Sequence, residues 1–421
     1  MYESEFNQKN ILVLNCGSSS LKYEIYRMPR RVSLGKGLVE RIGEKAGRLV
    51  QNSPKGELII EREIPDHTVA MELVGAALVD IKFGIMGDLG EISGIGHRVV
   101  HGGEKFSSSV VINSEVIKAI EENAELAPLH NPPNLMGIAA ATKLLPGITQ
   151  VGVFDTAFHQ TMPPSAYLYG LPRELYDKYK IRRYGFHGTS HRYVSARAME
   201  LMKRHPENTN VISCHLGNGA SLTAIESGRS IDTSMGFTPL EGVMMGTRSG
   251  DIDPAILFFL MERGMTPKEL NNMLNKKSGL LGTSGISNDL RDLEKAADEG
   301  VTNSIEALDL YAAKVRKYIG AYCANLVRVD ALIFTGGIGQ YGVRMRERIC
   351  HRLEYIGIVM DYEQNKKLGS QEGVVSSTYS PITILVIPTN EELQIAMDVF
   401  HLLFVGEPDE PRRRKHDVNL S

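Results

Sequence analysis

The chain has 421 residues, more than one ordinary hydrophobic core accommodates, so we expect two large lobes. Its 47 lysines and arginines against 50 aspartates and glutamates leave a formal net charge of −3, which gives no global attraction to nucleic acid or to an anionic membrane. Four cysteines without a CxxC pair, and no secretory leader, favour free thiols in the cytoplasm over disulfides or a structural zinc. The apolar runs are far shorter than the roughly 20 residues that span a bilayer, so we expect a soluble protein.

The first glycine-rich turn joins two predicted strands. In residues 11–26, ILVLNCGSSSLKYEIY, an apolar run enters a turn rich in hydroxyl groups, and alternating apolar and polar residues leave it. This alternation has the period of a half-buried strand. A Walker A loop or a Rossmann glycine turn must open a helix, so neither describes this segment. It remains a candidate phosphate cradle of another kind.

A second segment repeats this pattern. Residues 211–225, VISCHLGNGASLTAI, again run from an apolar strand through a glycine turn into an alternating strand. When the two segments are aligned, Gly17 falls on Gly217 and, after one inserted residue, Ser20 falls on Ser221. We interpret this match as an internal duplication, with chance similarity of two glycine turns as the alternative. Each of two lobes would then present one hairpin turn to a shared cleft.

A third glycine turn follows the apolar strand in residues 331–342, ALIFTGGIGQYG, and residues 343–358 predict an amphipathic helix. A strand, a glycine turn and a helix suit a nucleotide contact, because a helix start offers free N–H groups; close packing of helix on strand is the alternative. Other helix starts are expected at Asn134, at Asp253 with Pro254, and at Thr189 or Ser190. Alternating strands and helices indicate an α/β protein.

Two arginines and an aspartate lie where an anion could be bound. Arg98 is on an apolar strand that ends in two glycines, and Arg248 is in a polar loop before a helix. The guanidinium fork grips a carboxylate or phosphate, although a surface ion pair is the alternative for each. Asp155 ends an apolar strand, where a buried carboxylate needs a cation or a metal; helix capping is the alternative.

A histidine and a glutamate complete the candidate set. His187 precedes a long predicted helix and can donate to an oxyanion near its start, or be only a neighbour of the cap. Glu391, beside Glu392 after a strand, suits magnesium or the start of a helix. The sequence has no zinc-ligand spacing, no GxSxG and no Cys/His pair of recognisable spacing. Together these residues indicate phosphoryl transfer, which depends on positioning and charge neutralisation.

These segments resemble, in order and spacing, the motifs of the acetate kinase family. The resemblance covers residues 11–400 and is carried by LNCGSSSLKY, GHRVVHGG, HNPPN, FDTAFH, YGFHGTSH, HLGNGASL, DTSMGFTPLEGVMMGTRSGDIDP, SGLLGTSGISNDLRDL, FTGGIG and TNEE. It implies an α/β fold of two duplicated lobes of the actin-like ATPase (ribonuclease H-like) type, with an active-site cleft between the lobes. The N-terminal lobe, on the acyl and metal side, would comprise residues 1–156 plus 392–421, and the nucleotide-binding lobe residues 157–391. A homodimer is also implied.

The resemblance also implies a role for individual residues. The catalytic group would be Asp155, His187, Arg248 and Arg98, and the metal would be held by Asn15 and Glu391. Arg98 would also bind the acyl substrate, in a pocket completed by Val100, Leu129, Phe186 and Pro239. The residues expected to bind nucleotide and phosphate are Ser18, Ser20, Lys22, His215, Leu216, Gly217, Asn218, Gly219, Asp289, Arg291, Gly337, Ile338 and Gly339.

The sequence departs from the family pattern at the adenosine turn. The family usually has GIGEN there, whereas this chain continues from Gly339 into Gln340 and Tyr341. A tyrosine can stack on a base but cannot copy the hydrogen bonds of an amide. ATP is the leading donor, and another nucleoside triphosphate or a non-nucleotide phosphate donor stays open.

The activity implied is reversible transfer of the ATP γ-phosphate to acetate, giving acetyl phosphate and ADP by direct in-line displacement with Mg²⁺, or Mn²⁺ in its place. One added methylene shifts preference by only about 1 to 3 kcal/mol, so a propionate or butyrate kinase is the near alternative. An actin-like or chaperone-like ATPase switch is the alternative from another class. The charged tail from Glu407 is expected to be solvated.

Overall fold

The computed structural model describes residues 8–125, 127 and 130–406, so Leu129 and the charged tail lie outside the described residues. Contacts divide the chain into two compact units. The first comprises Met1–Val99, Ser108–Val153 and Glu392–Ser421, and the second Val100–Ser107 and Phe154–Glu391. Residues 100–107 and 154–156, which were expected in the first lobe, therefore group with the second unit.

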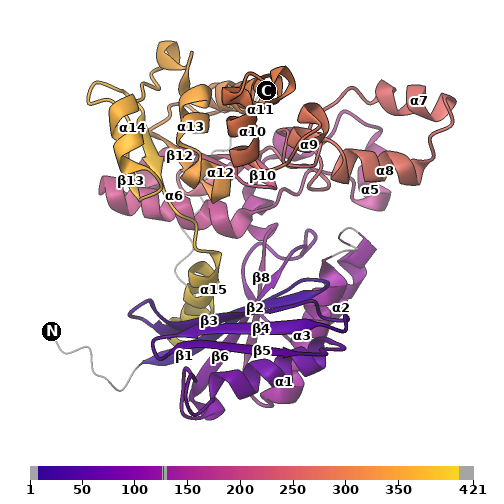
Figure 1. Ribbon diagram of the computed structural model, residues 1–421, viewed down its shortest axis with the longest axis vertical. Helices are drawn as coiled ribbons and strands as arrows, with labels where there is room; N and C mark the ends of the chain where they lie inside the picture. Colours follow the sequence, from indigo (N-terminus) through magenta and orange to yellow (C-terminus); the bar gives the residue numbers. More distant parts are fainter. Residues whose placement is uncertain (1–7, 126, 128–129, 407–421) are drawn as a thin grey trace, which may run out of the picture. The chain divides into compact units, whose positions relative to one another are not determined.

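The first unit is built on an eight-stranded mixed sheet, in the order β5-β4-β3-β2-β1-β6-β8-β7. Helices α1 and α3 cover one face and α15 covers the other (Figure 1). Its strands and helices are β1 Lys9–Cys16, β2 Ser20–Met28, β3 Val32–Glu40, β4 Gly47–Ser53, β5 Gly56–Arg62, β6 Ile92–Val99, β7 Val110–Val111, β8 Gln150–Phe154, α1 His67–Leu78, α2 Ser114–Glu122, α3 Asn131–Leu144 and α15 Glu391–Phe400.

The apolar run of β1 explains its central place in this sheet. Its residues Ile11, Leu12, Val13 and Leu14 are all buried, so both faces of the strand are covered. β1 pairs antiparallel with β2 and parallel with β6. The turn between β1 and β2 therefore leaves the sheet at the same end as the carboxyl end of β6.

The second unit is built on a six-stranded sheet, in the order β11-β10-β9-β12-β14-β13. Helix α6 packs on one face, and α10, α11 and α13 pack on the other (Figure 1). Its strands are β9 Asn210–Leu216, β10 Ala220–Glu226, β11 Arg229–Thr233, β12 Ala331–Thr335, β13 Gly373–Val374 and β14 Thr383–Val386. Its helices are α4 Pro164–Tyr167, α5 Arg173–Tyr179, α6 Gly188–Met202, α7 Ala255–Glu262, α8 Pro267–Lys276, α9 Gly279–Ser284, α10 Leu290–Asp298, α11 Thr302–Asn325, α12 Gly336–Tyr341, α13 Val343–Cys350 and α14 Tyr362–Leu368.

The two sheets repeat one topology. In each, a hairpin is followed by a third antiparallel strand, and the first strand of the hairpin pairs in parallel with a strand from later in the chain. The order β3-β2-β1-β6 thus corresponds to β11-β10-β9-β12. The α/β class and the repeated hairpin expected from the sequence are confirmed.

Two predicted helix starts are wrong. Helix α3 begins at Asn131 rather than Asn134, because Pro132 and Pro133 fit the first turn, where a missing N–H costs nothing. Helix α6 begins at Gly188 with His187 as its N-cap residue, ahead of the serine and threonine that the sequence favours. The start of α7 at Ala255 lies within a residue of the expected one, and Asp253 Oδ1 accepts a hydrogen bond from its N–H (2.9 Å).

The third glycine turn also differs from expectation. Residues Gly336–Tyr341 form the short helix α12, and α13 stops at Cys350 instead of running to residue 358. Arg352 adopts a left-handed backbone with φ of 74°, which ends the helical path. Within residues 8–125, 127 and 130–406, no helix has the length and apolar character needed to cross a bilayer.

Candidate active site

The turn between β1 and β2 carries the first predicted phosphate contacts. Asn15 pairs with Lys22 across the hairpin, Ser18 is exposed in the turn and Ser20 opens β2. Arg98 is half-buried on β6, directly after the residue that pairs with Leu14. Asn15 and Arg98 therefore lie at the same end of neighbouring parallel strands.

The backbone of this turn is held from two helices. His67 Nε2 on α1 donates to the carbonyl of Gly17 (2.8 Å), and Asn134 Nδ2 on α3 donates to the carbonyl of Cys16 (3.0 Å). Burial raises the pKa of the Cys16 thiol to about 12, so Cys16 is a packing residue and not a nucleophile. No sequence pattern predicts this role for His67 or Asn134.

The start of α15 is tied to the same hairpin. Lys22 Nζ forms an ion pair with Glu392, the second residue of α15. The Lys22 side chain is 47% exposed. Glu391 and Glu392 therefore open a helix, where acidic side chains interact favourably with the free N–H groups. Lys22, which the family resemblance assigns to phosphate, thus has a carboxylate partner in this structure.

Asp155 and the start of α6 approach each other closely. The N–H of Gly188 donates to the carbonyl of Asp155 (3.0 Å), and Thr189 Oγ1 donates to Asp155 Oδ1 (3.2 Å). A Cβ atom on Gly188 would lie 2.2 Å from the Asp155 carbonyl oxygen, so only glycine permits this approach. The buried Asp155 is therefore fixed next to His187.

His187 lies beside the turn between β9 and β10. Its backbone is left-handed, with φ of 56°, and its ring stacks on His215 with 4.2 Å between centroids. A Cβ atom on Gly219 would lie 3.5 Å from both His187 Nε2 and Arg248 Nη1. The N–H of Gly246 donates to the carbonyl of Asn218 (3.0 Å), which ties the loop of Arg248 to this turn. The structure thus brings His187, Arg248 and the glycine turn together.

The expected acyl pocket is placed only in part. Val100 and Phe186 belong to one buried cluster of the second unit, which also contains Met235 and Met244. Pro239 is half-buried in the loop after β11. Leu129 lies outside the described residues, so the fourth expected wall of this pocket stays a prediction.

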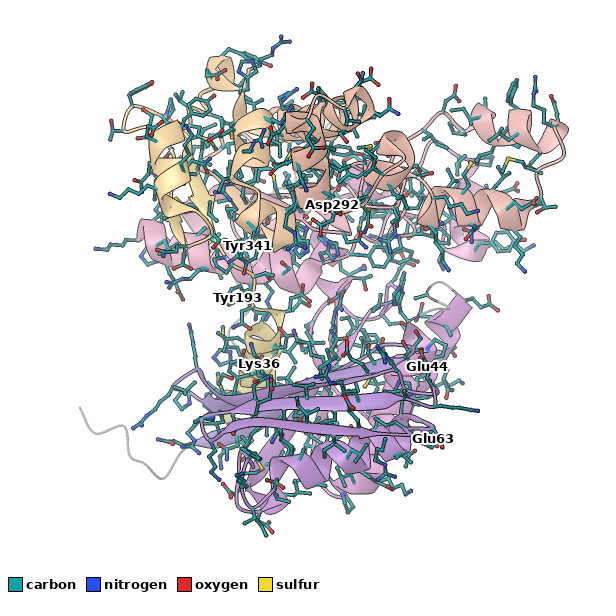
Figure 2. The ribbon with its side chains drawn as sticks, in the orientation of Figure 1. Lys36, Glu44, Glu63, Tyr193, Asp292 and Tyr341 are labelled. Atoms are coloured by element: carbon teal, nitrogen blue, oxygen red, sulfur yellow. The ribbon has the colours of Figure 1, made fainter. Side chains whose placement is uncertain are left out.

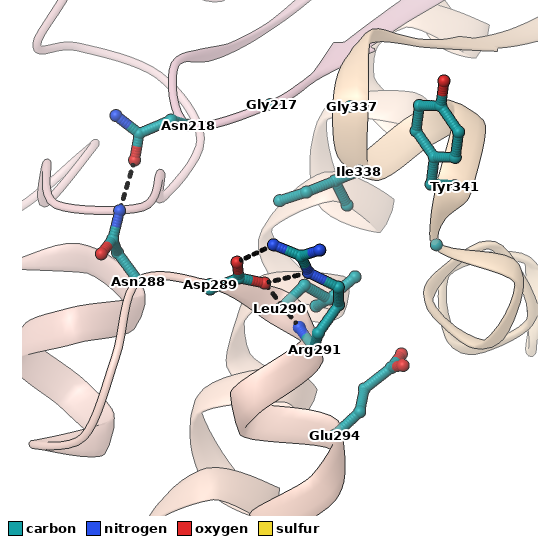
Figure 3. Close-up of a pocket in the computed structure, with 11 residues that line it drawn as sticks. Gly217, Asn218, Asn288, Asp289, Leu290, Arg291, Glu294, Gly337, Ile338 and Tyr341 are labelled. Atoms are coloured by element: carbon teal, nitrogen blue, oxygen red, sulfur yellow. Dashed lines mark hydrogen bonds and ion pairs between the residues drawn. The ribbon is translucent and has the colours of Figure 1, made fainter.

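A pocket of about 520 Å³ in the second unit collects six of the thirteen expected nucleotide and phosphate contacts (Figure 3). Asn218 and Asn288 lie at one end, joined by a hydrogen bond of 3.0 Å, and Tyr341 and Glu294 lie at the other. The pocket is lined by six residues expected from the sequence, Gly217, Asn218, Asp289, Arg291, Gly337 and Ile338. It also contains Tyr341, the position where the sequence departs from the family pattern, and four residues that were not expected, Asn288, Leu290, Glu294 and Gly342.

The floor of this pocket contains an ion pair. Asp289 caps α10 through the N–H of Arg291 (2.9 Å), and its carboxylate also accepts from Arg291 Nη2 (2.6 Å). The Arg291 side chain lowers the pKa of Asp289 to about 2, so the carboxylate stays charged at neutral pH. The pair is exposed enough for a ligand to compete for either partner.

The third glycine turn is held in place by the end of β9 and by a buried arginine. Gly336 has φ of 75°, and a Cβ there would lie 2.7 Å from the carbonyl oxygen of Leu216, so the turn abuts the end of β9. The fully buried Arg346 donates to the carbonyls of Gly339 (2.9 Å) and Gln340 (2.6 Å). Tyr341, next in the chain, is 67% exposed (Figure 2). No sequence pattern predicts this role for Arg346, because a lone arginine on a helix is usually at the surface.

The donor atoms suit magnesium better than a transition metal. Over the described ranges of the chain, no group of three or more His, Cys, Asp or Glu residues could hold a metal ion. The residues expected from the resemblance, Asn15 and Glu391, offer an amide oxygen and a carboxylate. These are hard oxygen ligands of the kind Mg²⁺ takes together with phosphate oxygens and water.

Known proteins resemble this chain along nearly its whole length. A sequence profile of the acetokinase family matches residues 10–397. The acetate kinase of Desulfitobacterium hafniense is 56% identical over 94% of this chain and all of its own length. The crystal structure of Porphyromonas gingivalis acetate kinase has a TM-score of 0.91 at 49% identity, covering 94% of this chain and all of its own. A propionate kinase from Francisella tularensis has a TM-score of 0.86 at 42% identity, covering 93% and 98%.

The two-sheet fold and these matches define a kinase whose phosphoryl acceptor is a carboxylate. ATP is the co-substrate of such enzymes. The chain belongs to the acetokinase family.

Proposed function

We propose that this protein catalyses the reversible transfer of the ATP γ-phosphate to acetate, giving acetyl phosphate and ADP by direct in-line displacement. The observation that carries the proposal is the turn between β9 and β10. Gly217 and Asn218 of this turn line the nucleotide pocket, and the next residue, Gly219, faces His187 and Arg248. A nucleotide whose phosphates point toward the turn would therefore present its terminal phosphate to an imidazole and a guanidinium.

Each of these residues has a separate task in the proposal. Arg98 and Arg248 bind the acetate carboxylate and the moving phosphoryl group. These two groups are both negatively charged and would otherwise repel each other. His187 donates from Nε2 to an equatorial oxygen as charge spreads in the transition state. Asp155, held against the start of α6, orients this arrangement.

Asn15 and Glu391 would hold Mg²⁺, with Ser18 and Ser20 beside it on the phosphate side. The ion would neutralise phosphate charge. We assign Asn15 and the neighbouring phosphate contacts to the N-terminal lobe and the remaining nucleotide contacts to the second unit, which also contains Val100, Phe186 and Pro239 of the acyl pocket. The acyl methyl group would contact Val100, Phe186, Pro239 and Leu129.

The test is trapping of acetyl phosphate by hydroxylamine, with acetate and ATP, GTP or pyrophosphate in parallel. The proposal requires acetyl hydroxamate with ATP and Mg²⁺. ATP hydrolysis that is independent of acetate, with no hydroxamate formed, would refute it in favour of an ATPase switch. Replacing Mg²⁺ by Mn²⁺ in the same assay tests the second metal.

A second candidate is a propionate or butyrate kinase, favoured by the structural match to a propionate kinase. A small apolar pocket discriminates weakly, since one methylene is worth only about 1 to 3 kcal/mol. The same assay with acids of two to four carbons separates the candidates by kcat/KM. A higher kcat/KM for propionate or butyrate than for acetate would reassign the substrate.

The assembly and compartment are also proposals. We propose a homodimer, supported by an exposed apolar helix in the second unit whose side chains have the character of an interface. We propose the cytoplasm as the compartment, supported by four free cysteines, three of them buried.

A further inference from the structure

A chain of buried hydrogen bonds lies behind His187. His187 Nδ1 is 2.8 Å from Ser221 Oγ on β10, and the same oxygen is 2.8 Å from Nε2 of His191 on α6. His191 Nδ1 is in turn 2.9 Å from Ser213 Oγ on β9. Ser213, Ser221 and His191 are all fully buried. Three elements thus meet in one line of hydrogen bonds that ends on His187.

The number of protons in this chain is limited. Burial lowers the pKa of His191 well below its ordinary value, and the neighbouring His159 and His215 act in the same direction. The His191 ring is therefore neutral and has a single N–H, and each serine has one hydroxyl proton. In a continuous chain of hydrogen bonds, all the donors point either toward His187 or away from it. This direction decides which ring nitrogen of His187 is protonated and which is a hydrogen-bond acceptor.

In the first direction, Ser213 donates to His191 Nδ1, His191 Nε2 donates to Ser221, and Ser221 donates to His187 Nδ1. His187 is then neutral and has its proton on Nε2, the nitrogen that faces Gly219. In the reverse direction His187 is protonated on Nδ1, and its Nε2 can donate only if the ring is charged. A second positive charge is disfavoured there because the Arg248 guanidinium approaches the same point.

We propose that Ser221 and His191 are positioning residues that hold His187 as the neutral tautomer protonated on Nε2. They contact no substrate and act through His187 alone. The choice of this direction, and the use of the Nε2–H as a donor to the transferring phosphoryl group, rest on the proposed function; the hydrogen-bond chain itself does not.

The tautomer can be measured in the wild-type protein without turnover. The protein is produced with ¹⁵N-labelled histidine, and the His187 signals are assigned by their loss in His187→Gln. At neutral pH we expect a protonated Nε2 and an unprotonated Nδ1, which have distinct ¹⁵N shifts. A His187 ring that is protonated on Nδ1, alone or together with Nε2, would overturn the proposal.

Kinetic measurements test whether this chain of hydrogen bonds contributes to phosphoryl transfer. Ser221→Ala removes the hydroxyl, and His191→Met removes the hydrogen bonds at similar volume. Each should lower kcat about 10- to 100-fold, by analogy with residues that orient metal ligands, with both KM values within about twofold. His191→Gln, whose amide N–H can replace Nε2–H, should recover part of kcat. The double variant Ser221→Ala/His191→Met should be no slower than Ser221→Ala, because the two residues act as one unit.

Thr223→Val is the matched control. Thr223 is buried on the same strand, opposite Ser213, and its Oγ1 lies 2.9 Å from Thr233 Oγ1, so this change removes a buried hydroxyl whose hydrogen bond is to another threonine. We expect wild-type kcat from it. Equal loss of kcat in Thr223→Val and Ser221→Ala, or a kcat for Ser221→Ala within about twofold of wild type, would overturn the role. A wild-type protein that makes no acyl phosphate would instead refute the proposed function and leave the NMR result standing.

Discussion

Arg248 is the residue whose loss should separate catalysis from stability most clearly. It lies in a loop beside Gly219, and burial lowers its pKa, although the guanidinium remains charged at neutral pH. Arg248→Ala removes a charge aimed at the phosphoryl group, so kcat should fall about 10²- to 10³-fold. The free energy of unfolding should change far less. Hydroxamate formation and urea unfolding, measured on the same preparation, check both expectations.

Arg248→Lys is the control for this variant. Lysine keeps the charge but lacks the bidentate fork, so we expect activity between that of Arg248→Ala and that of the wild type. An Arg248→Ala variant with near-normal turnover would refute the assignment of Arg248 to the phosphoryl group.

Tyr341 is the residue at which a contact to the nucleoside can be tested. It lines the end of the nucleotide pocket opposite Asn218, and it replaces the asparagine usual in the family (Figure 3). Tyr341→Asn should lower the KM for ATP about fivefold, the worth of one hydrogen bond of about 1 kcal/mol, with little change in kcat. Tyr341→Phe, which keeps the ring, should leave the KM near wild type. A KM that rises in Tyr341→Asn but not in Tyr341→Phe would show that stacking holds the base.

Residues whose signal is local could be assigned to the pocket from the sequence, whereas residues whose partners are distant could not. Gly217 and Gly337 could be predicted because each belongs to a glycine turn after an apolar strand. His191 could not, because a histidine inside a helix has no pattern and its partners come from two strands later in the chain. Arg346 was missed for the same reason, since carbonyl oxygens supplied by other segments satisfy its buried charge.

At the scale of elements, the strands were better predicted than the helix ends. β9 and β10 match the two apolar runs around HLGNG because alternation and burial fix strand positions directly. The start of α6 was misplaced because its cap is His187, a residue in left-handed conformation that the close approach of Gly188 to Asp155 imposes. Tertiary contact thus overrode the local preference for a serine or threonine cap.

Helix α7 is the element that should form the dimer contact. Its sequence, AILFFLME, is apolar almost all round, yet none of its residues is buried in the described structure. Phe258 is 65% exposed and Phe259 51%. Most soluble homo-oligomers are twofold dimers in which one patch contacts itself, and an exposed apolar helix is suited to that role. Phe258→Asp should therefore shift the protein from dimer to monomer, as measured by light scattering during size-exclusion chromatography.

Tyr355→Asp is the matched control, since Tyr355 is an aromatic residue that is 83% exposed on another segment. It should leave the mass of the particle unchanged. A monomeric wild type, or a Phe258→Asp variant that stays dimeric, would remove α7 from the proposed interface.

At the scale of the whole molecule, buried histidines should make the two units differ in acid. Burial lowers the pKa of His101 and His159 to about 4 and that of His191 well below its usual value, all in the second unit. In the first unit, burial likewise lowers the pKa of His97 to about 4. These histidines are neutral in both the folded and the unfolded state near pH 7, so their protonation does not lower the free energy of unfolding there.

The sign of the pH effect follows from these directions. As the pH falls below about 6.5, these histidines become protonated in the unfolded chain but stay neutral in the folded protein until about pH 4. The unfolded state therefore binds more protons across this window, and the free energy of unfolding decreases. Burial raises the pKa of the carboxyls of Asp232 and Glu294, which act in the opposite sense at its lower end. Between pH 7 and pH 5 the second unit should therefore lose more stability than the first. Urea unfolding followed by pulsed hydrogen exchange and mass spectrometry reports each unit separately, and an equal loss in both would contradict this account.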